Sequence, residues 1–226
     1  MASIRFLGHA GFEVEAHGRT VIFNPFLNPR PAFAQRLVPP ALSPHDIRRA
    51  DFVMLTDSAP DHCDPLDVAA IVARTNATVL APESVLEKLE VNPRLKMQAY
   101  AGDSFTMHGL DVDVTGANIR MAPDGVGYVL NDGAQRVYYA GPTHDFYGMS
   151  QLNAPEIAIL PIGGTSTMDM FSSIKAIKYL RPRVVIPMHY GTFAKINVNP
   201  HEWAKHVKND TKAEPIVIEV GESVSV

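Results

Sequence analysis

The alternation of hydrophobic and polar positions divides the chain into an N-terminal series of strands and a C-terminal alternation of strands and helices. Short apolar runs bounded by turn residues are typical of strands, and apolar positions three or four residues apart are typical of helices. Strands are predicted at residues 3–7, 11–16, 19–24, 52–56, 77–80, 97–100, 104–107, 110–115, 125–131, 135–140, 156–161, 183–187 and 215–219. Helices are predicted at residues 65–75, 83–90, 169–180 and 200–208. This order indicates two sheets packed together with helices outside them.

The segment from Asn24 to Pro44 interrupts this pattern with prolines and scattered apolar side chains. Its apolar residues are Phe26, Leu27, Phe33, Leu37 and Leu42. They favour either a lid packed over the surface or a subunit contact, and the second reading predicts a homo-oligomer. A surface loop without a role is the alternative for a segment of this length.

The composition is that of an ordinary globular protein, with 46% hydrophobic and 19% charged residues. Its length predicts one domain spanning residues 1–226. The net charge of −4 comes without a basic cluster, so no nucleic acid is expected as a partner. We expect a small-molecule substrate or ligand instead.

The start of the chain lacks the basic and apolar regions of a secretory signal, and no apolar run reaches the length of a membrane span. No membrane partner is therefore expected. The single cysteine, Cys63, excludes an intramolecular disulfide, and these features together predict a cytoplasmic protein. A thiol beside His62 raises the hypothesis of a nucleophile, but adjacent side chains seldom face each other, so we expect an unreactive buried cysteine.

The loop between Thr56 and Pro65 carries the most informative polar residues of the chain. It follows the predicted buried strand 52–56 and leads into a helix that Asp64 can cap, with Pro65 at its first position. This arrangement places the pair Asp61-His62 at the end of a strand, where side chains from several strands can converge. Loops in that position commonly hold ligands or catalytic groups.

Further landmarks accompany this loop along almost the entire chain. They are Leu7-Gly8-His9-Ala10-Gly11-Phe12, Asn24-Pro25-Phe26-Leu27, Tyr139-Ala140-Gly141-Pro142-Thr143, Leu160-Pro161-Ile162-Gly163-Gly164, Thr167-Met168-Asp169 and Ile186-Pro187-Met188-His189-Tyr190-Gly191-Thr192-Phe193. In order and spacing the chain resembles the metallo-β-lactamase superfamily, in the branch of sugar-phosphate lactonases and uncharacterised metal-dependent hydrolases. The resemblance implies an α/β fold, the four-layer αββα sandwich, with the active site at one edge.

The metal motif of that superfamily, Thr-His-x-His-x-Asp-His, is incomplete here. Asp57 and Ala59 stand where the two leading histidines belong, and Pro142 stands where a bridging aspartate is expected. No histidine occurs between His108 and His144, where the family has a further one. The resemblance therefore implies that the first of the two family metal sites is lost.

The ligands that the family assigns to its second metal are all retained. Asp61, His62 and His189 match them, and two imidazoles with one carboxylate suit zinc, manganese or ferrous iron, with positions open for water or substrate. The alternative is that these residues form a hydrogen-bonded polar cluster without any metal.

Two further residues are candidates for catalysis. His9 lies in a loop that the resemblance places near the metal, where it would carry a proton or contact substrate, although it could equally hold the loop by a backbone hydrogen bond. Asp57 would supply a fourth ligand oxygen or move a proton.

Additional pocket residues are expected around the position of the missing bridging aspartate. His144 would replace a ligand or act as a base if it points into that space, and Thr143 precedes it directly. Asn118 lies in the region where the family has its other histidine. A plain surface loop is the alternative for His144.

Two classes of function follow from these residues. The first is a hydrolase with one divalent metal that activates water and polarises a small ester, lactone or phosphoester. The second is a catalytically inactive, metal-free member of the family that binds a small ligand or a protein partner. Metal-free or iron-dependent chemistry in the same pocket is a third possibility.

Overall fold

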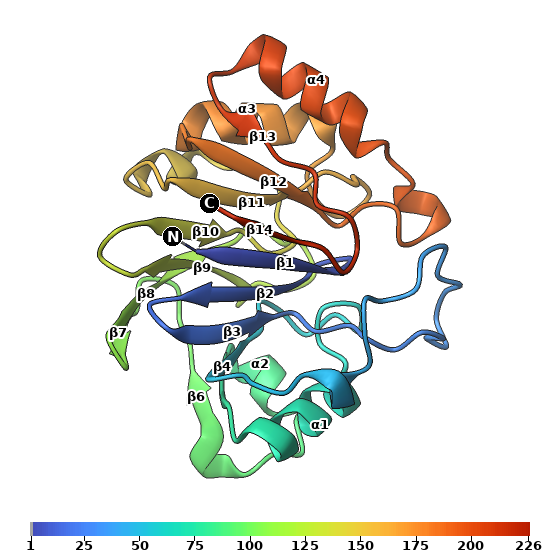
Figure 1. Cartoon of the computed structure of the whole chain (residues 1–226), viewed down its shortest axis with the longest axis vertical. Coiled ribbons are helices and arrows are strands. Elements are labelled where there is room, and N and C mark those ends of the chain that lie inside the picture. Colours follow the sequence, from blue (N-terminus) through green and yellow to red (C-terminus); the bar gives the residue numbers. More distant parts are fainter. Residues whose placement is uncertain (1) are drawn as a thin grey trace.

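A computed structural model describes residues 2–226 as two seven-stranded sheets packed face to face, with helices on both outer faces (Figure 1). The first sheet has the order β14-β1-β2-β3-β4-β5-β6. Its strands are β1 (Ser3–Gly8), β2 (Gly11–Ala16), β3 (Arg19–Phe23), β4 (Phe52–Met54), β5 (Thr78–Ala81), β6 (Lys96–Gln98) and β14 (Ser223–Ser225). Strands β3 to β6 run parallel to one another, whereas β14, β1, β2 and β3 are antiparallel.

The second sheet repeats this division, in the order β13-β12-β11-β10-β9-β8-β7. Its strands are β7 (Ser104–Met107), β8 (Leu110–Gly116), β9 (Val126–Asn131), β10 (Arg136–Tyr139), β11 (Ile157–Pro161), β12 (Val184–Met188) and β13 (Glu214–Pro215). Strands β10 to β13 are parallel, and β7 to β10 are antiparallel. The parallel strands β11 and β12 are buried throughout, which explains their continuous apolar runs.

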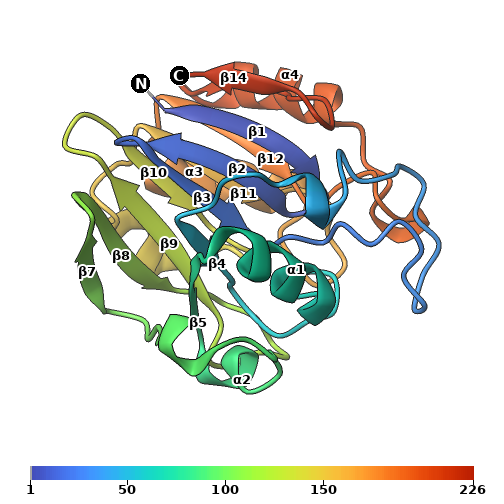
Figure 2. The same ribbon diagram turned by 60° about the horizontal axis from the view of Figure 1, so that its bottom comes forward.

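Helices cover the outer face of each sheet (Figures 1 and 2). The helices α1 (Pro65–Thr75) and α2 (Glu83–Leu86) lie against the first sheet, and α3 (Met170–Leu180) and α4 (Pro200–Asp210) lie against the second. Short 3₁₀ turns are η1 (Pro44–Asp46), η2 (Pro93–Leu95), η3 (Tyr147–Gln151) and η4 (Ala194–Ile196). The predicted four-layer αββα sandwich is therefore confirmed.

Aromatic side chains fill the space between the sheets. The rings of Phe23 and Tyr139 stack at 4.2 Å between centroids, and the Tyr139 hydroxyl donates to the Ala10 carbonyl at 2.6 Å. The Tyr128 hydroxyl donates to the Leu55 carbonyl at 2.7 Å. These bonds satisfy buried hydroxyl groups, and they join the second sheet to the strand ends of the first.

Two predicted elements differ from the structure, and one strand was not predicted. The helix expected at 83–90 ends at Leu86, because the chain beyond it forms 3₁₀-type hydrogen bonds. The Lys96 ammonium also donates to the carbonyl oxygens of Leu86 and Leu89. The strand expected at 215–219 shortens to β13, and Pro215 within it has no N–H for the sheet. An unpredicted strand, β14, pairs with β1 at the edge of the first sheet.

The segment from Asn24 to Pro44 is divided between buried and exposed residues. Phe26 and Leu27 are buried, and the Leu37 amide donates to the Thr192 carbonyl at 2.7 Å. The side chains of Phe33 and Leu37 remain 51% and 50% exposed. A subunit contact through these side chains stays a prediction. No helix within residues 2–226 is long and apolar enough to cross a membrane.

Candidate metal centre

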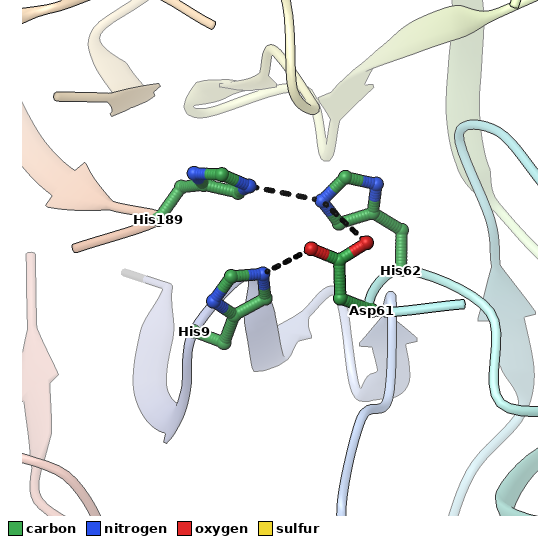
Figure 3. Close-up of side chains that lie close together, drawn as sticks. All are labelled: His9, Asp61, His62 and His189. Atoms are coloured by element: carbon green, nitrogen blue, oxygen red, sulfur yellow. Dashed lines mark hydrogen bonds and ion pairs between the residues drawn. The ribbon is translucent and has the colours of Figure 1, made fainter. Parts of the chain in front are cut away.

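Four side chains from three separate loops converge at one edge of the sandwich (Figure 3). His9 follows β1, Asp61 and His62 lie between β4 and α1, and His189 follows β12. One ligand atom from each lies within 4.8 Å of the others. Of the residues that the structure describes, this is the one group of at least three such side chains able to hold a metal ion.

The local sequence explains how these loops reach the same place. The chain leaves β4 and β12 at their carboxyl ends, where open parallel sheets commonly bind ligands. Asp64 caps α1 by accepting from the Leu66 amide at 3.0 Å, so the loop before it is held between a strand and a helix. His9 and His189 adopt left-handed backbone conformations, with φ of 60° and 58°, and the His189 amide donates to the His9 carbonyl at 2.7 Å. Such backbone conformations in non-glycine residues are concentrated at functional sites.

The distances within the cluster are short. His189 Nε2 lies 3.1 Å from His62 Nε2. The Asp61 carboxylate reaches two imidazoles, with Oδ2 at 3.3 Å from His9 Nε2 and Oδ1 at 3.8 Å from His62 Nε2. Metal–ligand distances of about 2.0–2.2 Å place neighbouring ligand atoms roughly 3–4 Å apart. The distances between these ligand atoms are thus close to those that a bound ion requires.

Asp57 lies next to this cluster and contacts His62. Its Oδ1 is 3.0 Å from His62 Nδ1 and accepts from the Ala59 amide, and its Oδ2 accepts from the Thr56 hydroxyl at 2.9 Å. Asn24 in turn donates to the Thr56 hydroxyl at 2.7 Å. Both oxygens of Asp57 therefore have partners, and a proton on His62 Nδ1 would leave Nε2 free for a metal.

The charges of the cluster follow from burial and from the two carboxylates. Burial disfavours the charged form of His62, but Asp57 and Asp61 outweigh it and raise its pKa to about 9. Burial, with the charge of His62, lowers the pKa of His9 to about 4 and also lowers that of His189. Despite its burial, Asp61 has a pKa well below the usual range because His62 and His9 lie beside it. His9, His189 and Asp61 are therefore in the protonation state that metal binding requires, whereas His62 must release a proton from Nε2 to bind an ion.

The buried nitrogens of the histidines test whether the cluster suits a metal. Both ring nitrogens of His9 and Nδ1 of His189 are buried without a hydrogen-bond partner within residues 2–226. Leaving such groups unpaired costs roughly 1–3 kcal/mol each. The polar contact of His9 Nε2 is to Asp61 Oδ2 at 3.3 Å, which is itself a candidate ligand atom, so an ion between them would satisfy both and the donor set fits a divalent ion.

A pocket of about 380 Å³ opens above the cluster. Its lining consists of Asp57, Ser58, Ala59, Asp61, His62, Ile119, Met121, Ala122, Pro142, Ser166, Thr167 and His189. His9 is absent from this lining and faces a smaller cavity of about 100 Å³ together with Arg36 and Tyr190. A molecule in the larger pocket therefore meets Asp61, His62 and His189 directly.

Similar proteins were found by sequence and by structure. A family model described as "Beta-lactamase superfamily domain" matches residues 3–189. This chain belongs to the metallo-β-lactamase superfamily. It is 36% identical to a UPF0173 metal-dependent hydrolase of Thermofilum pendens over 99% of both chains, and 34% identical to one of Thermococcus onnurineus over 98% of both. The structure of Igni18, a metallo hydrolase of Ignicoccus hospitalis, superposes with a TM-score of 0.81 at 28% identity, covering 99% of this chain and 97% of that one.

Within this metallo-β-lactamase fold, the predicted residues Asn118, Thr143 and His144 form a group of their own. The Asn118 amide donates to the Thr143 hydroxyl at 2.8 Å, and the His144 amide donates to the Asn118 carbonyl at 3.0 Å. Their neighbours Ile119 and Pro142 line the pocket, whereas these three do not. A backbone bridge joins the segments of Asn118 and His144, and a role for these three residues in the site stays a prediction.

Two other sequence predictions have clear outcomes. Cys63 is buried, and burial raises the pKa of its thiol to about 12, so it carries no thiolate for nucleophilic attack. The helix predicted at residues 169–180 is α3, and Asp169 caps it by accepting from the Ser172 amide at 2.8 Å.

Sequence reasoning placed His9 near the metal but not among the ligand candidates. The residues Gly8 and Ala10 on either side of it give no ligand motif. One signal was available, because a histidine at the very end of a predicted strand lies at the same kind of position as His189. The left-handed backbone that directs it at Asp61 has no signature in the sequence.

Proposed function

We propose that this chain is a one-metal hydrolase of small, neutral carboxylic esters or lactones, with the metal on Asp61, His62 and His189. The observation that carries the proposal is that these three side chains converge and line a single pocket. The relationship to metal-dependent hydrolases over the whole length of the chain supports the reaction class.

One metal is proposed instead of two because the positions of the first family site carry unsuitable groups. Ala59 and Pro142 have no side-chain donor atom. Asp57 has a carboxylate, but its oxygens are occupied by His62 Nδ1, the Ala59 amide and the Thr56 hydroxyl. A second ion next to the first would lack protein ligands.

The residues of the pocket would divide the remaining tasks. When bound, a divalent metal polarises a scissile carbonyl group and activates water. The side chains of Ile119, Met121 and Ala122 would hold the apolar part of the substrate and exclude water from it. The hydroxyl of Ser166 at the pocket wall would contact a polar group of the substrate.

The charges of the lining support a neutral substrate over a phosphoester. No lysine or arginine lines the pocket, while Asp57 and Asp61 are both ionised at neutral pH, with lowered pKa values. These two carboxylates balance the charge of one divalent ion. An anionic substrate would therefore meet no excess of positive charge, which phosphate-binding sites usually provide.

A second candidate function is a metal-free protein that binds a ligand in the same pocket. The observation in its favour is that His62 already has partners on both ring nitrogens, Asp57 at 3.0 Å and His189 at 3.1 Å. Such a cluster holds together without an ion. Metal content separates the two candidates.

The test is the metal content per chain of protein purified without chelator. The measurement is repeated after incubation with zinc, manganese or anaerobic ferrous iron, for wild type and for His62→Ala. We expect close to one ion per wild-type chain, its loss in the variant, and metal-dependent turnover of neutral esters or lactones in preference to phosphoesters. Absence of metal under every condition would overturn the proposal and leave the binding protein.

A further inference from the structure

His9 is the one member of the cluster for which the proposed function has no task. Its side chain is fully buried, and neither of its ring nitrogens has a hydrogen-bond partner within residues 2–226. The Nε2 atom lies 3.3 Å from Asp61 Oδ2, but the two atoms are not aligned as a hydrogen bond. Burying an imidazole nitrogen without a partner costs free energy of folding unless another group binds that nitrogen.

The direction of the ring indicates what that partner is. Figure 3 shows His9 Nε2 directed at the Asp61 carboxylate, whose other oxygen is directed at His62. The ring of His9 lies 4.4 Å from that of His189 and 5.6 Å from that of His62, measured between centroids. An ion bound to Asp61, His62 and His189 would therefore lie within reach of His9 Nε2.

The backbone fixes His9 in this position. Its φ of 60° is left-handed, and its carbonyl accepts the amide hydrogen of His189 at 2.7 Å. Phe26 and Phe193 pack against its ring, at 5.7 and 5.4 Å between centroids. A side chain held on several sides in this manner is preorganised for a fixed partner.

We infer that His9 is a fourth protein ligand of the metal, which binds from a side that the substrate pocket does not reach. This inference rests on the metal of the proposed function and adds a ligand to it. Because His9 is absent from the pocket lining, a direct contact with substrate there is not its role. Because Asp61, His62 and His189 line the pocket, water or substrate would reach a bound ion from their side.

Four protein ligands have a consequence for the choice of metal. A tetrahedral zinc ion with four protein ligands has no open position, which is typical of structural sites. Metals that accept five or six ligands, such as manganese or ferrous iron, keep at least one position for water or substrate. Activity through this ligand set therefore favours the second group, or zinc in an expanded geometry.

Cobalt(II) provides a test that does not depend on activity, because its visible absorption reports the number and type of its ligands. The full-length wild type, His9→Ala and His9→Asn are titrated with Co²⁺ in competition with a chelator. Asparagine tolerates the left-handed backbone, so the second variant keeps the turn if alanine does not. His17→Ala is the matched control, since His17 is also left-handed, with φ of 50°, but is exposed and outside the cluster.

We expect one Co²⁺ per wild-type chain and the same spectrum in His17→Ala. In both His9 variants the absorption should shift and the affinity should fall by at least about 100-fold, since even residues behind a ligand contribute roughly 10–100-fold. Added imidazole should restore the absorption of His9→Ala and leave the wild type unchanged.

The failures of the two proposals are distinguishable. Wild-type binding of Co²⁺ with an unaltered spectrum and affinity in both His9 variants would overturn the role of His9 and leave the one-metal site intact. Absence of Co²⁺ binding in the wild type would overturn the metal site itself, and with it this inference.

Discussion

By its resemblance to the superfamily's metal motif, the chain has Asp57 where the first histidine is expected. The Asp57 carboxylate contacts the candidate ligand His62 on the nitrogen that faces away from the cluster. A carboxylate on the far nitrogen of a metal-binding histidine fixes the ring and its tautomer. Asp57 Oδ1 and His62 Nδ1 form this arrangement at 3.0 Å. We therefore propose that Asp57 is a positioning residue for His62.

This interpretation predicts a graded effect at residue 57. In Asp57→Ala the metal affinity should fall by roughly 10–100-fold, because His62 loses the partner that orients it. In Asp57→Asn the loss should be smaller, since the amide oxygen can still accept from His62 Nδ1. Competition with a chelating dye measures both, and equal affinities for wild type and Asp57→Ala would contradict the positioning role.

A second residue-scale prediction concerns Asp67 in α1. Its Oδ2 accepts from the Leu27 and Asn28 amides at 2.6 and 3.1 Å, but burial raises its pKa to about 6. Between the unfolded value of about 4 and this value, the folded protein binds more protons than the unfolded chain, so the contribution of Asp67 to stability falls as pH rises.

Asp67→Asn keeps an acceptor oxygen and removes this titration. Its free energy of unfolding, relative to wild type, should therefore increase between pH about 4 and about 6 and then level off. Urea denaturation across this range measures the difference. The exposed Asp210, replaced by Asn, controls for loss of a charge, and a difference independent of pH at residue 67 would contradict the prediction.

At the scale of elements, the ends of β11 and β12 must approach closely to place His189. A Cβ added to Gly163, just after β11, would overlap the His189 carbonyl oxygen and lie 3.0 Å from Ile196 Cβ. The φ of Gly163 is not left-handed, so backbone freedom is not the reason for glycine here. Glycine is required because a side chain would prevent the close approach. The close approach to His189 thus explains the first glycine of the pair Gly163-Gly164.

Gly163→Ala should therefore destabilise the fold and displace His189. Overpacking of this kind costs about 1–3 kcal/mol, and metal affinity should fall with it. Gly116→Ala is the matched control, because its added Cβ would lie at an ordinary 3.9 Å from Ala101 Cβ. Denaturation and metal titration test both variants, and a Gly163→Ala protein that behaves as Gly116→Ala does would sink the argument.

At the scale of the whole molecule, the candidate metal centre joins the two sheets. His9, Asp61 and His62 are attached to strands of the first sheet, and His189 is attached to the second. An ion held by all of them would link the two halves of the sandwich in the folded state only. Its binding free energy would then add to the stability of the fold.

The resulting prediction is a higher melting temperature with metal. At a free metal concentration of about 100 times Kd, the fold gains about 2.7 kcal/mol, which raises Tm by roughly 5–10 °C for a chain of this size. The wild type should show this rise over chelator-treated protein, and His189→Ala should not. Identical melting curves with metal and with chelator would speak against the link.

The sequence by itself determined the layered architecture and the most polar loop of the site. The periodicity of short strands, the caps at Asp64 and Asp169, and the strand end before Asp61-His62 are properties of neighbouring residues. Local patterns of this kind are written in the order of the residues. For this reason the helices α1 and α3 and the loop between β4 and α1 were predictable.

Only the tertiary structure decided which distant side chains meet. The end of α2 depends on Lys96, β14 depends on β1, and the place of His9 depends on the backbone bond that His189 donates to it. The direction of Asp57 toward His62 depends equally on Thr56 and its partners. The pairing of β14 with β1, the bond between His189 and His9, and the bond from Asn24 to Thr56 join residues remote in the chain. Packing of the sheets sets these distances, so no local pattern of residues specifies them.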